Sequence, residues 1–455
     1  MRRRLLTILA AATWGAVLAL PAPAAPVSGA ASPARTLVLE RIELEGNTRT
    51  GLATVLDRID LRPGEPLRID RLETAAEDLR RTRLFREVAI HTRPGSAPGR
   101  VVAVFRVREN RPHLRLGAGY EDLSGWYLIP LEFNLDNLTG RGEALSLATR
   151  FGYRVSGLVL NLRSSPAAAK RSFWMARLRA EEQSRIYFDD GIEINHPVSR
   201  GGLDLGFGIP LGRRVLLETT LSFEGVEPDS SATVYRDREI LGRSRGAAVP
   251  FAELPASIRA DLGRRNQTRL ALALQGEARR GTGLEARGLR GRIHLEGVLS
   301  DEANFVRATV DGRAYLPLGD GLQAAAHLRG GVVSVEAPFY ERSYLGGLYT
   351  VRGYPSQSLS PPGGDRGMAA ASVELRTAWI GPAADPRVTG LLFLDAGWAG
   401  GDGAVDLKDT AVGIGYGIRV RVPWVRRIGL DVGVPLSSSP VDESFHLNFG
   451  LGWTY

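Results

Sequence analysis

The last eleven residues of the chain alternate strictly between large apolar and small or polar side chains. In an extended strand one set lies on one face (Phe445, Leu447, Phe449, Leu451, Trp453 and Tyr455), and the residues between them lie on the other (His446, Asn448, Gly450, Gly452 and Thr454). Segments of similar texture recur between turn signals from residue 112 onward, without a convincing helix. This pattern predicts an all-β domain over residues 112–455.

The length of this region limits the number of strands. Sixteen antiparallel strands leave roughly 21 residues for each strand and its connection, which suits membrane-spanning strands of about 9–11 residues. Twelve to eighteen strands would also fit the 344 residues. We expect a β-barrel, with sixteen strands as the preferred number.

Alternation alone does not say which face of the barrel is apolar. A soluble barrel turns its large apolar residues inward, and a membrane barrel turns them outward. Four features favour the membrane: a signal-like N-terminus, charges on the polar face, an aromatic C-terminal residue, and long loops around residues 227–250 and 355–368. We therefore predict a transmembrane barrel.

Residues 1–24 are organised like a secretory signal peptide. Arg2–Arg4 provide positive charge, Leu5–Leu20 an apolar core, and Ala22–Ala24 a small-residue cleavage site. The core is shorter than the roughly 20 residues that a spanning helix needs, which favours a cleaved signal over an uncleaved anchor. Residues 25–35 are rich in Ala, Pro and Ser and are expected to form a flexible leader. The absence of cysteine fits a protein of the bacterial envelope.

Residues 36–110 predict a separate α+β module with the order β-α-α-β-β. Within it, Asp70 is a good N-cap for a helix whose apolar face comprises Leu72, Ala75, Ala76 and Leu79. The two later strands form a hairpin whose exposed edge could accept an extended peptide. A passive spacer domain explains the same pattern equally well, because edge strands are often merely protected.

The sequence carries no compact signature of catalysis or of ligand binding. None of the six histidines stands in a metal-binding spacing, and no nucleophile elbow or phosphate loop is present. Gly413–Gly417 resembles a nucleotide loop faintly, but it lies inside a strand pattern and is interpreted as small lumen-facing residues. The net charge of +8 is not gathered into a basic stripe, which argues against nucleic acid. We expect no enzyme activity, no cofactor and no metal, although spacing alone leaves open an active site built from distant strands.

Two short motifs near the C-terminus stand out. Val351, Arg352, Gly353 and Tyr354 precede a proline in a long loop, and Phe393, Asp395 and Gly397 follow about forty residues later in an apolar strand. An arginine followed by glycine, an aromatic residue and proline requires a specific backbone path. We expect Arg352 to reach into the barrel lumen and to pair with Asp395.

These motifs resemble those of the BamA/TamA outer-membrane assembly superfamily, which includes the TpsB two-partner secretion transporters. In that family a [VI]RG[FY] loop folds into the lumen, and its arginine pairs with the aspartate of an F-x-D-x-G strand. Residues 36–110 resemble its periplasmic POTRA domain, and Asp136–Gly142 resembles an N-x-x-G-x-G segment early in its barrel. The terminal strand, with Phe449, Leu451, Trp453 and Tyr455, resembles the signal by which such barrels are themselves inserted.

The resemblance implies an outer-membrane protein with its POTRA-like domain in the periplasm. It implies partners that are unfolded outer-membrane or secreted client polypeptides, outer-membrane lipid, and periplasmic accessory proteins. Assembly and secretion members usually carry two or more POTRA domains, whereas this sequence has room for one. Gly364–Gly367 followed by Glu374 resembles the secretion branch. The expected function is insertion or translocation of client polypeptides; a TpsB-like transporter and a passive outer-membrane pore are the alternatives.

Overall fold

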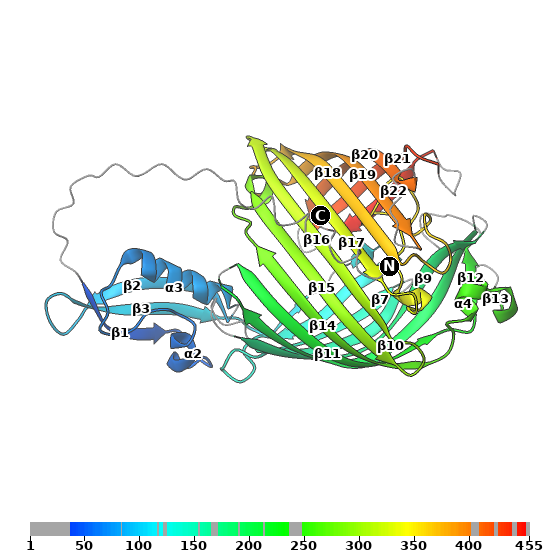
Figure 1. Ribbon diagram of the computed structural model, residues 1–455. Coiled ribbons are helices and arrows are strands. Elements are labelled where there is room, and N and C mark those ends of the chain that lie inside the picture. Colours follow the sequence, from blue (N-terminus) through cyan, green and yellow to red (C-terminus); the bar gives the residue numbers. More distant parts are fainter. Residues whose placement is uncertain are drawn as a thin grey trace, which may run out of the picture.

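A computed structural model describes residues 37–82, 84–115, 118–121, 125–152, 155–164, 172–189, 192–212, 214–235, 248–401, 409–422, 426–438 and 444–451. They form a small N-terminal module and a β-barrel, which lie end to end (Figure 1). We call the end of the barrel beside the module the module end and the opposite end the far end. The expected signal peptide and leader, Trp453 and Tyr455 lie outside the described residues.

The N-terminal module (residues 37–110) has the predicted element order. Its elements are β1 (Val38–Glu45), α2 (Leu52–Leu56), α3 (Ile69–Arg81), β2 (Phe85–Pro94) and β3 (Arg100–Glu109). The sheet order is β1-β3-β2, with β1 parallel and β2 antiparallel to the central strand β3. The predicted apolar face of α3 is buried in the module core (Leu72, Ala75, Ala76 and Leu79).

The predicted N-cap of α3 is wrong. Arg68 is the capping residue, and it makes no side-chain capping bond. Asp70 lies in the first helical turn, where its carboxylate faces the positive end of the helix dipole and pairs with Arg68 at 3.0 Å. The helix therefore begins two residues earlier than a capping aspartate would place it.

The barrel consists of antiparallel strands joined by alternating turns and loops. They are β4 (His113–Arg115), β5 (Ala118–Glu121), β6 (Gly125–Leu135), β7 (Ala144–Gly152), β8 (Val155–Arg163), β9 (Phe173–Asp189), β10 (Ile192–Pro210), β11 (Val215–Pro228), β12 (Ala232–Tyr235), β13 (Ala248–Val249), β14 (Arg265–Glu277), β15 (Gly288–Ser300), β16 (Phe305–Gly319), β17 (Leu322–Val333), β18 (Gly367–Ile380), β19 (Val388–Gly400), β20 (Ala411–Val422), β21 (Arg426–Pro435) and β22 (His446–Leu451). The order closes, with β22 beside β4.

The described strands correspond to sixteen staves, where a stave is one strand position around the barrel wall. Strands β4 and β5 both pair with β6 and so belong to one stave. At the far end of the barrel, β10 pairs with β12, whereas the rest of β10 pairs with β11. Strand β13 pairs with β12. These two short strands extend the wall beyond β11 and do not add a stave. The count agrees with the preferred number from the sequence.

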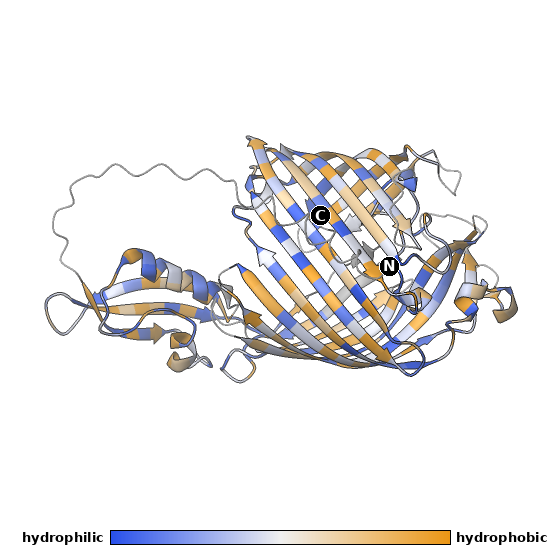
Figure 2. Ribbon diagram, in the orientation of Figure 1, coloured by the Kyte–Doolittle hydropathy of each residue, from blue (hydrophilic) through white to orange (hydrophobic). Residues whose placement is uncertain are grey.

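The barrel wall has an apolar outer face and a polar inner face. On β19, Leu392 and Leu394 are 60% and 49% exposed. Phe393 and Asp395, which alternate with them along the strand, are 3% and 0% exposed. Strand β14 repeats the pattern, with Leu270 and Leu272 exposed and Arg269 buried. Figure 2 shows this alternation along the staves. Water-soluble barrels have the reverse arrangement, so the outer face is suited to lipid.

The barrel interior is filled in part by the loop that joins β17 to β18, residues 334–366, which we call the lumen loop. Its first half, with η3 (Phe339–Glu341), packs against the far-end segment that contains η1 (Phe251–Glu253) and α4 (Ala256–Arg259). Its second half forms an apolar cluster with β18 and β20. Among the described residues, no helix has the length and apolar character needed to cross a membrane.

Candidate functional site

Both sequence motifs meet inside the barrel. Val351, Arg352 and Tyr354 of the lumen loop have no exposed surface, and neither has Asp395 of β19. The loop reaches this depth because its polar groups find partners on the inner wall. Arg352 is therefore a fully buried cation, which is stable only when it is paired and hydrogen-bonded.

Arg352 makes a bidentate contact with Asp395. Its Nε and Nη2 donate to the two carboxylate oxygens at 2.7 and 2.8 Å, and its backbone N–H donates to Oδ2 at 3.0 Å. The same carboxylate accepts a hydrogen bond from Ser372 at 2.6 Å. Bidentate, charge-assisted bonds of this kind fix both distance and orientation.

Two further acids complete the site. Arg352 Nη1 lies 2.7 Å from Glu374 of β18 and 3.4 Å from Asp431 of β21. We call Glu374, Asp395 and Asp431 the acidic wall. Arg376 pairs with Glu374 at 2.6 Å, and Arg419 pairs with Asp431 at 2.5 Å. Three arginines thus balance three carboxylates, all buried, and removal of Arg352 would leave one negative charge in excess.

Phe393 supports the arginine from one face. Its ring centroid lies 3.6 Å from the guanidinium carbon of Arg352, a close cation–π stack. Phe393 and Asp395 project from the same face of β19, two residues apart, so one strand supplies both the stacking ring and the carboxylate. This geometry explains why an aromatic residue and an acid occur at that spacing.

The glycines of the site make room for the loop. Gly353 has φ +102°, which side-chain-bearing residues rarely adopt. A Cβ on Gly397 would lie 2.4 Å from the Val351 side chain, and a Cβ on Gly413 would lie 1.9 Å from the Arg352 carbonyl oxygen. The glycines of Gly413–Gly417 thus face the lumen as interpreted from the sequence, whereas Ile414 and Tyr416 are exposed on the outer face, and Gly413 admits the loop backbone.

Tyr354 and Val351 attach the loop on either side of Arg352. The Tyr354 hydroxyl donates to the carbonyl oxygens of Val412 and Ser437 at 3.0 and 3.1 Å. Val351 packs with Leu345, Tyr354 and residues of the wall. Every residue of the loop motif therefore contacts the barrel interior.

The sequence motifs indicate only one partner of Arg352, Asp395. They do not point to Asp431 or Ser372, and they involve Glu374 only through its resemblance to the secretion branch. The available signal was Ser372, Glu374 and Arg376, three polar residues at every second position of a strand whose intervening residues are apolar. Asp431 and Arg419 come from other strands, and only the strand register brings them together.

The predicted insertion signal is only partly described. Strand β22 pairs with β21, so Phe449 lies opposite Leu430 and Leu451 opposite Ile428. Leu447 is exposed on the outer face and Asn448 is buried, as the alternation predicts. Trp453 and Tyr455 follow the described part of this strand.

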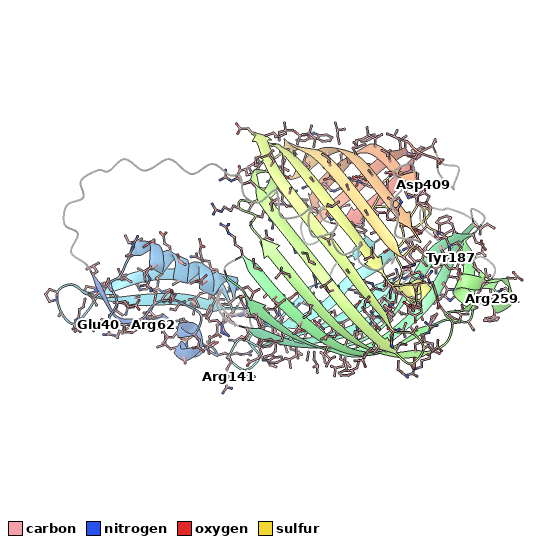
Figure 3. The ribbon with its side chains drawn as sticks, viewed as in Figure 1. Glu40, Arg62, Arg141, Tyr187, Arg259 and Asp409 are labelled. Atoms are coloured by element: carbon pink, nitrogen blue, oxygen red, sulfur yellow. The ribbon has the colours of Figure 1, made fainter. Side chains whose placement is uncertain are left out.

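The N-x-x-G-x-G segment forms a junction between barrel and module. The Asn137 side-chain amide donates to the Thr50 hydroxyl at 2.7 Å, and its oxygen accepts from the Gly142 N–H at 2.9 Å. Thr54 donates to the Gly140 carbonyl at 3.1 Å, and Arg58 donates to the Arg141 carbonyl at 2.7 Å. Figure 3 shows Arg141 at the module end, whereas Tyr187, Arg259 and Asp409 lie at the far end.

Glu109 orders the module side of this junction. Its carboxylate accepts hydrogen bonds from the Thr48 hydroxyl at 2.5 Å and from the backbone N–H groups of Arg49 and Thr50. Partial burial acts to raise the pKa of Glu109, but these hydrogen bonds to the charged form outweigh it and lower the pKa to about 2. The ionised carboxylate therefore stabilises the loop that receives Asn137.

Metal ligands are not gathered anywhere in the described part of the chain: no group of three or more histidine, aspartate or glutamate side chains is placed to hold an ion. The chemistry of the two sites above is that of ion pairs and hydrogen bonds between segments of the chain.

Comparison with known proteins identifies the family of the chain. Residues 137–455 match the Omp85 superfamily domain. The outer membrane protein assembly factor BamA of Nitratidesulfovibrio vulgaris is 24% identical over 359 residues, which cover 75% of this chain but only 41% of that protein. The chain thus spans about two fifths of the length of this relative.

Solved structures share the fold at lower identity. BamA from Haemophilus ducreyi lacking POTRA domains 1–3 superposes with a TM-score of 0.65 at 16% identity, covering 91% of this chain and 83% of that one. CdiB from Escherichia coli gives 0.59 at 14% identity, covering 92% and 76%. The family match extends over more than half of the chain and includes both lumen motifs. The resemblance inferred from the motifs is confirmed: this chain belongs to the Omp85 superfamily.

Proposed function

We propose that this protein assists the insertion or translocation of client polypeptides at the outer membrane. In this proposal residues 1–24 are a cleaved signal peptide, residues 36–110 a POTRA-like domain in the periplasm, and residues 112–455 the membrane barrel. The observation that carries it is the lumen loop, held by fully buried Arg352 on the acidic wall of an Omp85 chain. Passive conduction through a pore does not require a buried arginine that holds a loop inside the lumen.

The barrel surface supports the membrane location. Large apolar residues face outward on successive staves, and charged residues face the lumen. The terminal strand, from Phe449 through Leu451 to Trp453 and Tyr455, would act as the signal for the protein's own insertion.

The edge of the module offers a site for client capture. Strand β2 pairs with β3 on one side, and no other described strand pairs with it. Its free backbone groups could accept an extended client segment by β-augmentation, in which main-chain hydrogen bonds supply affinity without sequence specificity. The junction at Asn137 would then hold this edge near the module end of the barrel.

The lumen loop would regulate passage. Buried ion pairs strongly resist removal of one partner but gain little overall when intact, because desolvation offsets most of their attraction. A loop held in this way is ordered without being permanently fixed. The client would pass along the lumen or along the seam between β22 and the first stave.

Depletion of the protein combined with single-channel recording tests this function. We expect depletion to reduce the amounts of other outer-membrane barrels or of a secreted polypeptide, and the purified protein to stay mostly closed. Unchanged levels of both client classes, together with a steady open conductance, would instead identify a passive pore. Loss of one secreted polypeptide alone would indicate a transporter of the secretion branch.

A further inference from the structure

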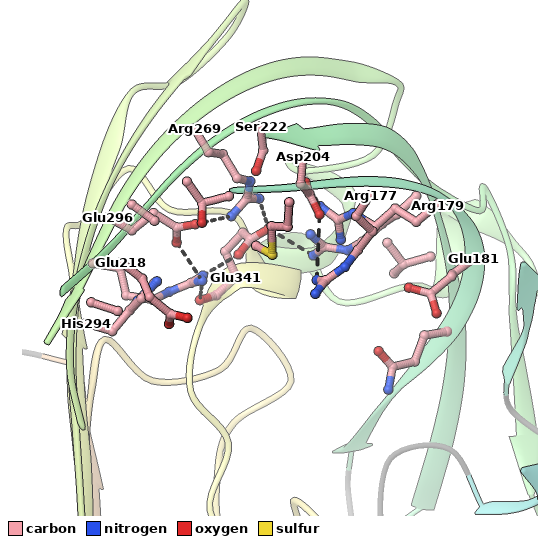
Figure 4. A pocket seen from close by; sticks show the side chains of 18 of the residues that line it. Arg177, Arg179, Glu181, Asp204, Glu218, Ser222, Arg269, His294, Glu296 and Glu341 are labelled. Atoms are coloured by element: carbon pink, nitrogen blue, oxygen red, sulfur yellow. Dashed lines mark hydrogen bonds and ion pairs between the residues drawn. The ribbon is translucent and has the colours of Figure 1, made fainter. Parts of the chain in front are cut away.

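The lumen loop carries a second buried charge, of opposite sign to Arg352. Glu341, at the end of η3, is 6% exposed. Its carboxylate pairs with Arg200 of β10 at 2.9 Å and with Arg269 of β14 and Arg307 of β16. Figure 4 shows Glu341 entering this group from the loop.

A fourth arginine, Arg185, and one of these three also bind the backbone of η3. Arg185 of β9 donates to the Tyr340 carbonyl at 2.5 Å, and Arg307 donates to the Glu341 carbonyl at 2.7 Å. We call Arg185, Arg200, Arg269 and Arg307 the arginine site. Its ligand is a carboxylate side chain together with two successive peptide carbonyls, which is the chemistry of an acidic peptide.

The arginine site carries more positive charge than its own wall can balance. Among the strand residues that the structure describes, Glu224 and Glu296 alone pair with its members. Without Glu341, four arginines would face two carboxylates. An empty site would therefore leave buried Arg269 and its partly buried neighbours short of two carboxylates, so departure of Glu341 is favoured when another anion replaces it.

The two ends of the loop differ in their access to solvent. All four arginines and Glu341 line a cavity of about 660 Å³ in the lumen, which also receives the side chains of Arg177 and Arg292. Arg352 and the acidic wall do not line this cavity. A second carboxylate can thus approach the arginine site from the lumen, whereas Arg352 and the acidic wall are at most 2% exposed.

We propose that the arginine site is a receptor for acidic peptide segments, occupied in this structure by the loop's own Tyr340–Glu341. An acidic segment of a client in the lumen replaces Glu341 and frees the first half of the loop, while Arg352 retains the second half. This proposal rests on the proposed function, because it requires a client in the lumen. Its binding step can be measured in detergent without any assay of client insertion.

The absence of cysteine allows single-cysteine reporters for each half of the loop. Ala337→Cys reports on the first half, since Ala337 is 1% exposed. Ser358→Cys reports on the second half, since Ser358 is 3% exposed and its hydroxyl has no hydrogen-bond partner among the described residues. Each is labelled by a maleimide in folded, detergent-solubilised protein.

The probe is a synthetic peptide that copies residues 336–344, and the control peptide replaces the glutamate of position 341 by glutamine. We expect the acidic peptide to accelerate labelling of the cysteine at 337 at concentrations where the control peptide does not, and to leave the cysteine at 358 protected. Equal effects of the two peptides, no effect of either, or release of both cysteines together would overturn the proposal.

Substitutions supply a second, independent measurement. Glu341→Gln should accelerate labelling at 337 by about tenfold, as expected for loss of a charge-assisted contact. Glu336→Gln is the matched control, because Glu336 lies in the same loop and is exposed. Arg307→Gln should abolish the response to the acidic peptide. A Glu341→Gln protein that stays as protected as the Glu336→Gln protein would show that Glu341 does not hold the loop.

If labelling follows these expectations while depletion leaves client levels unchanged, the arginine site binds acidic peptides but the proposed function fails. If client insertion depends on the protein while the peptides have no effect, the proposed function survives without this site.

Discussion

Two segments attach to the barrel by opposite physical means. The lumen loop is held at Arg352 by ionised side chains with no exposed surface, and its charges are balanced within the acidic wall. The module is held at Asn137 mainly by single hydrogen bonds between uncharged groups, in a turn where Asn137 is buried but Leu138, Thr139 and Arg141 are exposed. The first attachment is costly to break by substitution, and the second is weak at every individual contact.

This difference suggests that the two attachments respond differently to salt and to substitution. Salt screens buried ion pairs little, so the loop should be insensitive to ionic strength and should move only when its contacts are replaced. A hydrogen bond between uncharged groups contributes only about 1 kcal/mol net. We therefore expect the junction to give way before the loop does, and each prediction below separates the two attachments.

The largest effect is expected for Arg352→Gln. This substitution leaves the acidic wall with one unbalanced carboxylate and removes the stack on Phe393, at a cost of about 3 kcal/mol or roughly a hundredfold in opening of the loop. Labelling of a Ser358→Cys reporter should rise accordingly while the barrel still inserts and client handling falls. Arg290→Gln, at a half-exposed arginine of β15, serves as the control. An unchanged labelling rate with full activity would show that Arg352 neither holds the lumen loop nor contributes to client handling.

A smaller effect is expected for Gly413→Ala. The added methyl would lie 1.9 Å from the Arg352 carbonyl oxygen, so the loop must shift, at about 1–3 kcal/mol. Gly297→Ala is the matched control, because a Cβ there meets no atom within 4 Å. Hydrogen exchange of residues 345–358 should accelerate in the first variant alone, and equal exchange in both would show that close approach at Gly413 does not position the loop.

Asn137→Ala should affect the module and leave the loop unchanged. It removes two hydrogen bonds at about 1 kcal/mol each and places alanine at φ +58°, whereas Asn137→Gly removes the bonds but tolerates the backbone. Spin labels on module and barrel should show a broader distance distribution in both variants, more so for alanine. Broadening in the alanine variant alone would assign the role of Asn137 to its backbone conformation.

The smallest effect is a pH dependence at Glu109. Because its folded pKa is lowered to about 2 from an ordinary value of 4.5, its stabilising contribution is complete above pH 4.5 and is lost as the pH falls toward 2. Amide exchange at residues 48–50 should differ between the native protein and Glu109→Gln near neutral pH, and this difference should shrink with acidification. A difference that persists undiminished at low pH would contradict the assigned role of the carboxylate.

The sequence could predict features that repeat or that lie close along the chain. Alternation predicted the staves and their outer face, and helical spacing predicted the buried face of α3. Arg352 and Asp395 were recognisable because each stands in a compact motif. The cap of α3 was mispredicted because residue preference at helix starts is weak beside packing of the helix as a whole.

Residues whose significance depends on strand register could not be predicted. Asp431 reaches Arg352 from a strand 79 residues away, and the arginine site gathers side chains from four strands around a glutamate in an ordinary loop sequence. Each is one polar residue among many on the lumen face. Only the closed order of staves and the path of the loop bring them within hydrogen-bonding distance.

Hydrogen exchange on the unmodified protein tests the central claim most directly. The Arg352 amide donates to the buried Asp395 carboxylate, so residues 349–357 should exchange as slowly as the flanking strands β18 and β19 and should stay slow at high salt. If the amide hydrogens of residues 349–357 exchange as fast as those of an exposed connection such as residues 301–304, the loop is not held in the lumen by the Arg352–Asp395 pair.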